Sequence, residues 1–203
     1  METGERQEMK RFVTFEGIDG SGKSTISKLV YKKLQDEGYD VAHTYEPTDT
    51  KIGKYVQKCI KTKSDPFVIA FTFIADRIEH CRQIQKWLDS KKIVLCDRYA
   101  ESTYAYQGAQ LEEYIKDPIY WLQELSKDRI IIPERTFLFV IDPKESLARI
   151  QNRDELIPFE RMAFLEKVHK NYLAVSKGKR FLHIDATKTI DEIVNICYND
   201  IIK

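Results

Sequence analysis

The glycine-rich segment GIDGSGKST, residues 17–25, restricts the fold more than any other part of the chain. Its spacing is G-x-x-x-x-G-K-[ST], in which the glycines let successive backbone N–H groups point at phosphate oxygens. The helix that follows such a loop adds the positive end of its dipole. Strand-like residues RFVTFE precede the segment and helically spaced apolar residues follow it, as the motif requires. A chance glycine-rich turn is the alternative, but both flanks favour a phosphate-binding loop.

The loop and one later strand end carry the candidate phosphate and metal groups. Lys23 is expected to reach the β- and γ-phosphates, and the Ser24 hydroxyl to bind Mg²⁺. Asp97 ends the apolar run IVLCD, where its carboxylate is well placed to hold Mg²⁺ through water, with Arg98 beside it in the same crevice. An ordinary strand-end salt bridge is the alternative for Asp97 and Arg98. All nine loop residues are candidate nucleotide-binding residues: Gly17, Ile18, Asp19, Gly20, Ser21, Gly22, Lys23, Ser24 and Thr25.

Strand-like and helical segments alternate along the chain. The strand-like segments after the first are residues 39–47, 93–97, 136–142 and 180–185. Helical patterns cover residues 26–34, 52–60, 66–90, 114–127, 144–154, 158–177 and 189–202, with Asp65 as N-cap and Pro66 in the first turn of the third. This alternation predicts an α/β fold, a parallel sheet with helices on both faces and ligands at the carboxyl ends of the strands. Residues 1–203 show no linker or repeat and are expected to form one domain.

Composition limits the partners. The 33 basic and 32 acidic residues nearly balance, which gives no electrostatic case for nucleic acid as a partner. Residues 1–10 are polar, so we expect a frayed extension that is neither a signal peptide nor a membrane anchor. The four cysteines, Cys59, Cys81, Cys96 and Cys197, are scattered, without the spacing of a metal site or a disulfide framework. Cys96 lies in the apolar run IVLC and is interpreted as a small buried hydrophobe in a reducing, cytoplasmic compartment.

Beyond the phosphate loop, several motifs resemble those of thymidylate kinase, a P-loop nucleoside monophosphate kinase. The matching segments are FEGIDGSGKST, Glu46-Pro47, FTFIADR at 71–77, DRYAESTYAYQG at 97–108, RIQNRDELIPFER at 149–161 and HIDAT at 183–187. The resemblance implies a P-loop NTPase fold with a five-stranded parallel sheet and a short mobile lid over residues 149–161. It also implies a homodimer that transfers the γ-phosphate of MgATP to dTMP, giving dTDP and ADP. HIDAT would border the adenine, mostly through its backbone.

The same resemblance assigns the contacts to dTMP. Phe73 would stack on the thymine ring while Arg77, four residues later and so on the same helical face, would donate to O4. Ser102 or Thr103 would meet the N3 edge of thymine. Tyr106 would press against the deoxyribose, with Gln107 near the sugar and base. Core packing is the alternative for Phe73, a solvated helix face for Arg77, and half-buried helix packing for Tyr104 and Tyr106.

The acceptor phosphate is the next contact that the resemblance implies. Arg98 would bind it, and Asp19 would lie near it and the sugar 3′-hydroxyl; a turn-favouring role is the alternative for Asp19. Bacterial relatives often have arginine where this chain has Tyr45, so one expected phosphate-binding arginine is absent.

Phosphoryl transfer needs positive charge around the moving group. The variable loop positions 18–21 hold no basic residue, so the charge must come from elsewhere. Arg149 and Arg153, spaced i and i+4, are the catalytic candidates, with Arg161 a third; solvated surface is the alternative for all three. The lid sequence also lacks the glycine-containing bacterial pattern.

Two other functions remain open from the sequence. A deoxynucleoside kinase or another nucleoside monophosphate kinase would use the same loop, and so would a nucleotide-dependent switch or partition protein. A switch needs no second nucleotide pocket, so FIADR and DRYxxSTxAYQG argue against it. The segment FVIAFTFIA, residues 67–75, is a candidate dimer interface, although a buried core helix would show the same pattern.

Overall fold

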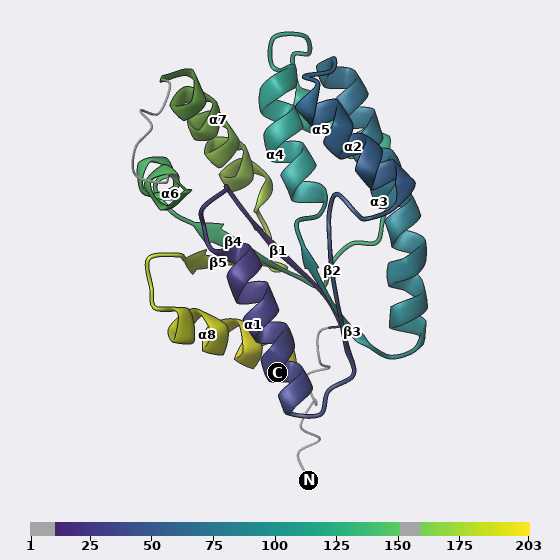
Figure 1. Ribbon diagram of the computed structural model, residues 1–203, viewed down its shortest axis with the longest axis vertical. Helices are drawn as coiled ribbons and strands as arrows, with labels where there is room; N and C mark the ends of the chain where they lie inside the picture. The colour runs from purple at the N-terminus through teal and green to yellow at the C-terminus, as the bar shows by residue number, and fades with distance from the viewer. Residues whose placement is uncertain (1–10, 151–158) are drawn as a thin grey trace.

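A parallel five-stranded sheet forms the centre of the molecule, as the alternation of segments predicts (Figure 1). The computed structural model describes residues 11–150 and 159–203. Every strand pair is parallel, and the order across the sheet is β2-β3-β1-β4-β5. The strands are β1 (Phe12–Gly17), β2 (Val41–Tyr45), β3 (Ile93–Asp97), β4 (Arg135–Val140) and β5 (Phe181–Asp185).

Helices connect and cover these strands. They are α1 (Lys23–Asp36), α2 (Lys51–Lys61), α3 (Pro66–Asp89), α4 (Ala100–Leu111), α5 (Pro118–Ser126), α6 (Pro143–Ile150), α7 (Phe159–Val175) and α8 (Ile190–Ile202). α3 begins as expected, with the Asp65 carboxylate accepting from the Phe67 N–H at 2.8 Å. The helix expected from residue 114 begins only at Pro118, because Asp117 caps it and proline favours a first turn. The part of the expected helix 144–154 beyond Ile150 lies outside the described residues.

The two faces of the sheet bury different hydrophobic clusters. Along β1, Val13 and Phe15 pack in one cluster that includes Val30 of α1, whereas Phe12 packs in a second that includes Ala70 and Ile74 of α3. Alternate residues of a strand point to opposite faces, so helices on both sides are needed to cover β1. Cys96 is fully buried in the second cluster, which confirms its interpretation as a small hydrophobe.

Parallel pairing places the candidate site at one edge of the sheet. Phe15 of β1 pairs with Asp97 of β3, and Tyr45 of β2 pairs with the same residue. The carboxyl ends of these three strands therefore meet, and the phosphate loop, Glu46 and Arg98 leave the sheet side by side.

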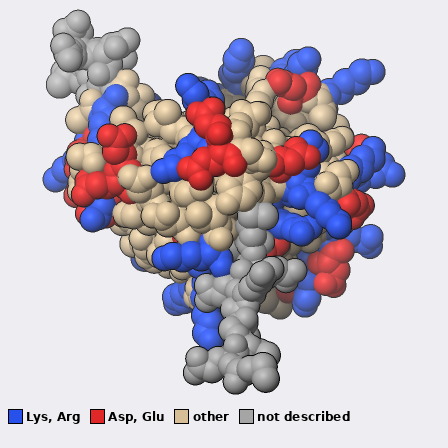
Figure 2. Space-filling model, turned by 90° about the horizontal axis from the view of Figure 1, so that it is seen from below, with Lys and Arg blue, Asp and Glu red and all other residues tan. Residues whose placement is uncertain are grey.

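On the surface, positive and negative side chains are interspersed over the face that Figure 2 presents. This distribution agrees with the near balance of 33 basic and 32 acidic residues. In the described parts of the chain, none of the helices has both the length and the apolar character needed to span a membrane.

Candidate active site

The phosphate loop lies between β1 and α1, in the strand-loop-helix context that its sequence predicts (Figure 1). Gly17 has a φ of 144°, and a Cβ there would lie 2.7 Å from the Phe139 carbonyl oxygen of β4. Gly20 has a φ of 81°, and its Cβ would lie 2.3 Å from the Ser146 carbonyl oxygen of α6. Only glycine fits either position. The Ser146 hydroxyl also donates to the Asp19 carbonyl, so α6 packs directly on the loop.

Lys23 begins α1 and folds back over the loop. Its side chain is buried, and its Nζ donates to the Ile18 carbonyl at 3.3 Å and lies 3.8 Å from Asp19 Oδ1. Burial, reinforced by the nearby Arg98 cation, lowers the pKa of Lys23 to about 8. A phosphate group would add a second anionic partner beside Asp19.

Asp97 and Ser24 suit a Mg²⁺ ion. Asp97 Oδ1 is buried without a hydrogen-bond partner in the part of the chain that the structure describes. A buried carboxylate oxygen left unpaired is costly unless a ligand satisfies it. Ser24 lies exposed in the first turn of α1. Carboxylate and hydroxyl oxygens, completed by substrate phosphates, are the ligands that Mg²⁺ takes in such sites.

Arg98 turns toward the phosphate loop from the end of β3. Its backbone has a φ of 68°, in the left-handed region. Its Nη2 pairs with Asp19 Oδ1, its Nη1 donates to the Ser102 hydroxyl at 3.2 Å, and its guanidinium lies 5.3 Å from the centre of the Tyr106 ring. These contacts hold one cation between the loop and α4.

A cavity of about 910 Å³ opens beside this cation. Seven of the eight residues expected to contact dTMP line it: Asp19, Phe73, Arg77, Arg98, Ser102, Tyr106 and Gln107. Phe73 is half-buried and faces the cavity, so core packing does not describe its position fully. Tyr104 is not among the residues that line the cavity; it is buried, and its hydroxyl hydrogen-bonds to Ser126. This position agrees with the alternative of helix packing for Tyr104.

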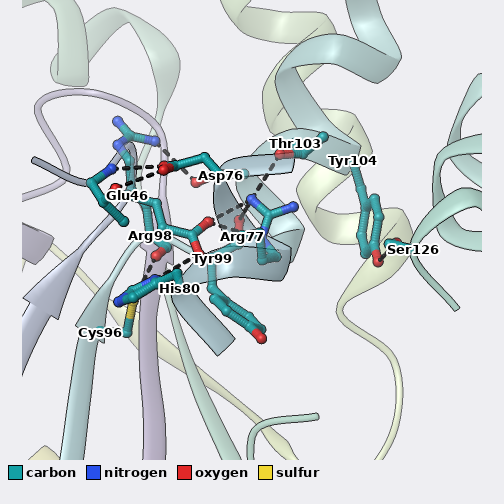
Figure 3. Close-up of polar contacts among 12 residues, drawn as sticks. Glu46, Asp76, Arg77, His80, Cys96, Arg98, Tyr99, Thr103, Tyr104 and Ser126 are labelled. Atoms are coloured by element: carbon teal, nitrogen blue, oxygen red, sulfur yellow. Dashed lines mark hydrogen bonds and ion pairs between the residues drawn. The ribbon is translucent and has the colours of Figure 1, made fainter. Parts of the chain in front are cut away.

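Arg77 of α3 is fixed in an almost fully buried position, which excludes the solvated helix face (Figure 3). Its Nε donates to Glu46 Oε2 at 2.8 Å, and its Nη2 donates to the Tyr99 carbonyl and the Thr103 hydroxyl, both at 2.9 Å. Nη1 is buried without a partner in the described chain. Arg77 is also one of the residues that line the cavity.

Thr103 is the expected contact residue that the structure does not bring to the cavity. It is 1% exposed, and its hydroxyl accepts from Arg77. We therefore correct its role from reading thymine N3 to supporting Arg77. Ser102 does line the cavity, but its hydroxyl donates to Glu16 Oε2 at 2.6 Å. The Gln107 side-chain amide makes only a long contact of 3.4 Å to Gln110. It is therefore freer than the Ser102 hydroxyl to hydrogen-bond to the edge of a base.

Of the candidate lid arginines, Arg149 and Arg161 are not among the residues that line the cavity. Arg149, in the last turn of α6, donates from Nη1 to the Ala186 carbonyl at 3.0 Å and pairs through Nη2 with Glu145 at 2.7 Å. It therefore contacts the 183–187 segment, which the family resemblance places beside the adenine. Arg153 lies outside the described residues, and Arg161 is exposed on α7.

Three buried residues of the site had no role in the sequence analysis. Glu16 accepts from the Tyr99 N–H at 2.6 Å, and also from Ser102 and Tyr172. Glu46 and His80 are hydrogen-bonded, with Nδ1 3.0 Å from Oε1. Their signals were present, since Glu16 interrupts an apolar strand beside Gly17 and His80 follows Arg77 at i+3 on one helix.

The comparisons with known proteins agree with this geometry. The thymidylate kinase family model matches residues 15–196. A "Probable thymidylate kinase" of Methanosarcina barkeri is 38% identical over 187 residues, covering 90% of this chain and 91% of the relative. Proteins of the same description from Methanocaldococcus jannaschii and Sulfurisphaera tokodaii are 38% and 37% identical, each over 91% of this chain and 92% of the relative. This chain therefore belongs to the thymidylate kinase family.

Proposed function

We propose that this chain transfers the γ-phosphate of ATP to dTMP, forming dTDP and ADP. The observation that carries the proposal is the cavity of about 910 Å³ beside the phosphate loop, lined by seven residues expected to hold a second nucleotide. A nucleotide-dependent switch has no use for such a second pocket. Arg98 at the wall of the cavity favours an acceptor that already bears a phosphate over a nucleoside.

The reaction forms a bond between an acceptor phosphate oxygen and the γ-phosphorus, and breaks the bond from that phosphorus to the β–γ bridging oxygen. The dTMP phosphate is ionised at neutral pH, so no side chain has to remove a proton from the nucleophile. Lys23 and Arg98 would hold the donor and acceptor phosphates in line and neutralise their charge. Ser24 and Asp97 would hold Mg²⁺, which when bound supplies further positive charge to the phosphate oxygens.

Base selection would depend on the free Nη1 of Arg77. Thymine and uracil present the O4 acceptor, whereas cytosine presents an amino donor that would leave this buried cation mispaired. The expected order of kcat/KM is dTMP above dUMP, by roughly 1 to 3 kcal/mol for the methyl group, and dUMP well above dCMP. Phe73 would stack on the base and Tyr106 on the sugar.

The decisive assay mixes the protein with MgATP and, in turn, dTMP, dUMP, dCMP and thymidine. ADP release and the phosphorylated product are then measured. Rapid dTDP formation from dTMP supports the proposal. Release stimulated by thymidine but not by dTMP would identify a deoxynucleoside kinase, and release unchanged by any acceptor would favour a switch.

We also propose that the protein is a homodimer that works in the cytoplasm. On α3, Val68, Phe71 and Ile78 are 40%, 49% and 37% exposed, whereas Ala70 and Ile74 of the same helix are in the core. The segment 67–75 thus has both a core face and an exposed apolar face, and the latter suits a second copy. Sedimentation of wild type and Phe71→Glu should show a dimer and a monomer; a monomeric wild type at micromolar concentration would refute this interface.

A further inference from the structure

A buried chain of polar groups leads from Arg77 to β2 (Figure 3). Glu46 Oε2 accepts from Arg77, and Glu46 Oε1 faces His80 Nδ1 at 3.0 Å. On the other side of its ring, His80 Nε2 lies 2.7 Å from the Thr44 hydroxyl. Arg77, Glu46 and His80 are 1%, 4% and 5% exposed, so water does not compete for these contacts.

The ring of His80 determines how Glu46 is held. A nitrogen that faces a carboxylate oxygen carries a proton, so Nδ1–H donates to Glu46. Both oxygens of Glu46 then have donors, one from each side. Because Glu46 contacts Arg77 at both Nε and Nη2, fixing this carboxylate also fixes the plane of the guanidinium. That plane sets where the unpaired Nη1 points.

We propose that His80 is a positioning residue for base selection, acting through Glu46 to orient the free Nη1 of Arg77. The inference rests on the proposed function, because it assumes that a base with a carbonyl acceptor occupies the cavity. Without the donor from His80, Glu46 can rotate and Arg77 can tilt with it. A misaligned Nη1 would bind the O4 of thymine less well. A guanidinium free to tilt would also discriminate less against the amino group of cytosine.

Two amide substitutions separate the two sides of the His80 ring. In His80→Asn the side-chain nitrogen can occupy the place of Nδ1, which keeps the donor to Glu46 and loses the contact to Thr44. In His80→Gln the nitrogen can reach the place of Nε2, which keeps the Thr44 contact and loses the donor to Glu46. Both variants remove the ring and its packing, so they serve as matched controls for each other.

The experiment measures kcat and KM for dTMP and dCMP, KM for ATP, and thermal stability. His80→Gln should reduce the dTMP to dCMP ratio of kcat/KM by roughly tenfold or more, mainly through a raised KM for dTMP. The KM for ATP should stay unchanged. His80→Asn should keep the ratio within about threefold of wild type. Folded His80→Gln with the wild-type ratio, or equal loss of the ratio in both variants, would overturn the proposal.

Failure of this inference can be told apart from failure of the proposed function. If wild type does not phosphorylate dTMP, or does not discriminate against dCMP, the function or the base-reading role of Arg77 is wrong. If wild type discriminates and Arg77→Gln abolishes the discrimination while His80→Gln does not, only the role of His80 is wrong. Should His80→Gln not fold, His80→Ala also removes the donor to Glu46, and an unchanged ratio in that folded variant overturns the proposal.

Discussion

Nucleotide binding should draw a proton from solution at alkaline pH, and Lys23 is the group that takes it up. In the free protein this ammonium is buried beside Arg98, donates to the Ile18 carbonyl at 3.3 Å and lies 3.8 Å from Asp19 Oδ1, and its pKa is lowered to about 8. Phosphate oxygens placed at Nζ would offset the burial and return the pKa to its ordinary range. The lowered pKa also predicts that the free energy of unfolding increases as pH rises from about 8 toward 10, because the unfolded state holds the Lys23 proton more tightly than the native state does.

The size of the uptake follows from the two pKa values. With a pKa of about 8 in the free protein, roughly a quarter of Lys23 is protonated at pH 8.5, against nearly all of it at an ordinary pKa of about 10.4. Binding should therefore take up about 0.75 proton per nucleotide at pH 8.5. At pH 7 the free protein is already charged at Lys23, and uptake by this group should fall below about 0.1 proton.

Isothermal titration of ADP in buffers of different protonation enthalpy measures this number directly. At pH 8.5 the phosphates of ADP are fully ionised, so they contribute no proton. Lys23→Arg is the matched control, because arginine keeps the charge and does not lose its proton in this pH range. As a second readout, kcat/KM for ATP should fall above about pH 8 while kcat does not, since kcat/KM reports the free enzyme. Uptake below about 0.2 proton in wild type, or equal uptake in Lys23→Arg, would refute the reasoning.

Three further substitutions test other parts of the structure. Burial and the neighbouring Glu101 raise the pKa of Glu16 from 4.5 to about 7, so between these values the native protein binds more protons than the unfolded protein, and its free energy of unfolding should fall as pH rises from about 5 to 7. Urea titrations should show a smaller pH slope of this free energy in Glu16→Gln than in wild type, and equal slopes would contradict the prediction. Gly53→Ala should lower stability, because the new alanine Cβ would lie 2.0 Å from the Thr48 carbonyl oxygen and overpacking costs about 1 to 3 kcal/mol, against a gain of up to about 1 kcal/mol in helix propensity. A raised denaturation midpoint would contradict this and show that α2 shifts without cost. Arg149→Met should reduce kcat by roughly 10-fold or more and leave KM for dTMP within about twofold; wild-type turnover with lost dTMP affinity would move Arg149 to the acceptor site.

The parts of the fold that the sequence predicts well are those encoded locally. The phosphate loop is specified by nine consecutive residues, and Asp65 with Pro66 mark the start of α3 within two positions. Strand order is not local, yet the parallel arrangement follows because each strand is followed by a helix that returns the chain to the same edge. The late start of α5 was missed because the apolar spacing of residues 114–117 continues that of the helix, and the cap at Asp117 outweighs it.

The site was only half predictable for a related reason. Motif spacing and resemblance could name Arg77, but its partner Glu46 lies 31 residues away and its acceptor Thr103 lies 26 residues away on another helix. Which of Ser102 and Thr103 faces the cavity depends on Glu16, which binds Ser102 from β1 across 86 residues. Such choices are made by the packed structure, where a buried hydroxyl must pair with whatever group the fold presents.

Asp19 connects the two cations that flank the expected path of the phosphoryl group. Its Oδ1 atom pairs with Arg98 Nη2 and lies 3.8 Å from Lys23 Nζ, so one carboxylate oxygen contacts a cation from α1 and a cation that follows β3. One negative charge between two positive ones leaves a net positive field at that point. In the proposed reaction the charge on the equatorial oxygens of the transferred phosphoryl group would meet this field. In the proposed reaction the end of β3 would supply one cation and α1 the other, while Asp19 partly offsets the repulsion by Arg98 that lowers the pKa of Lys23.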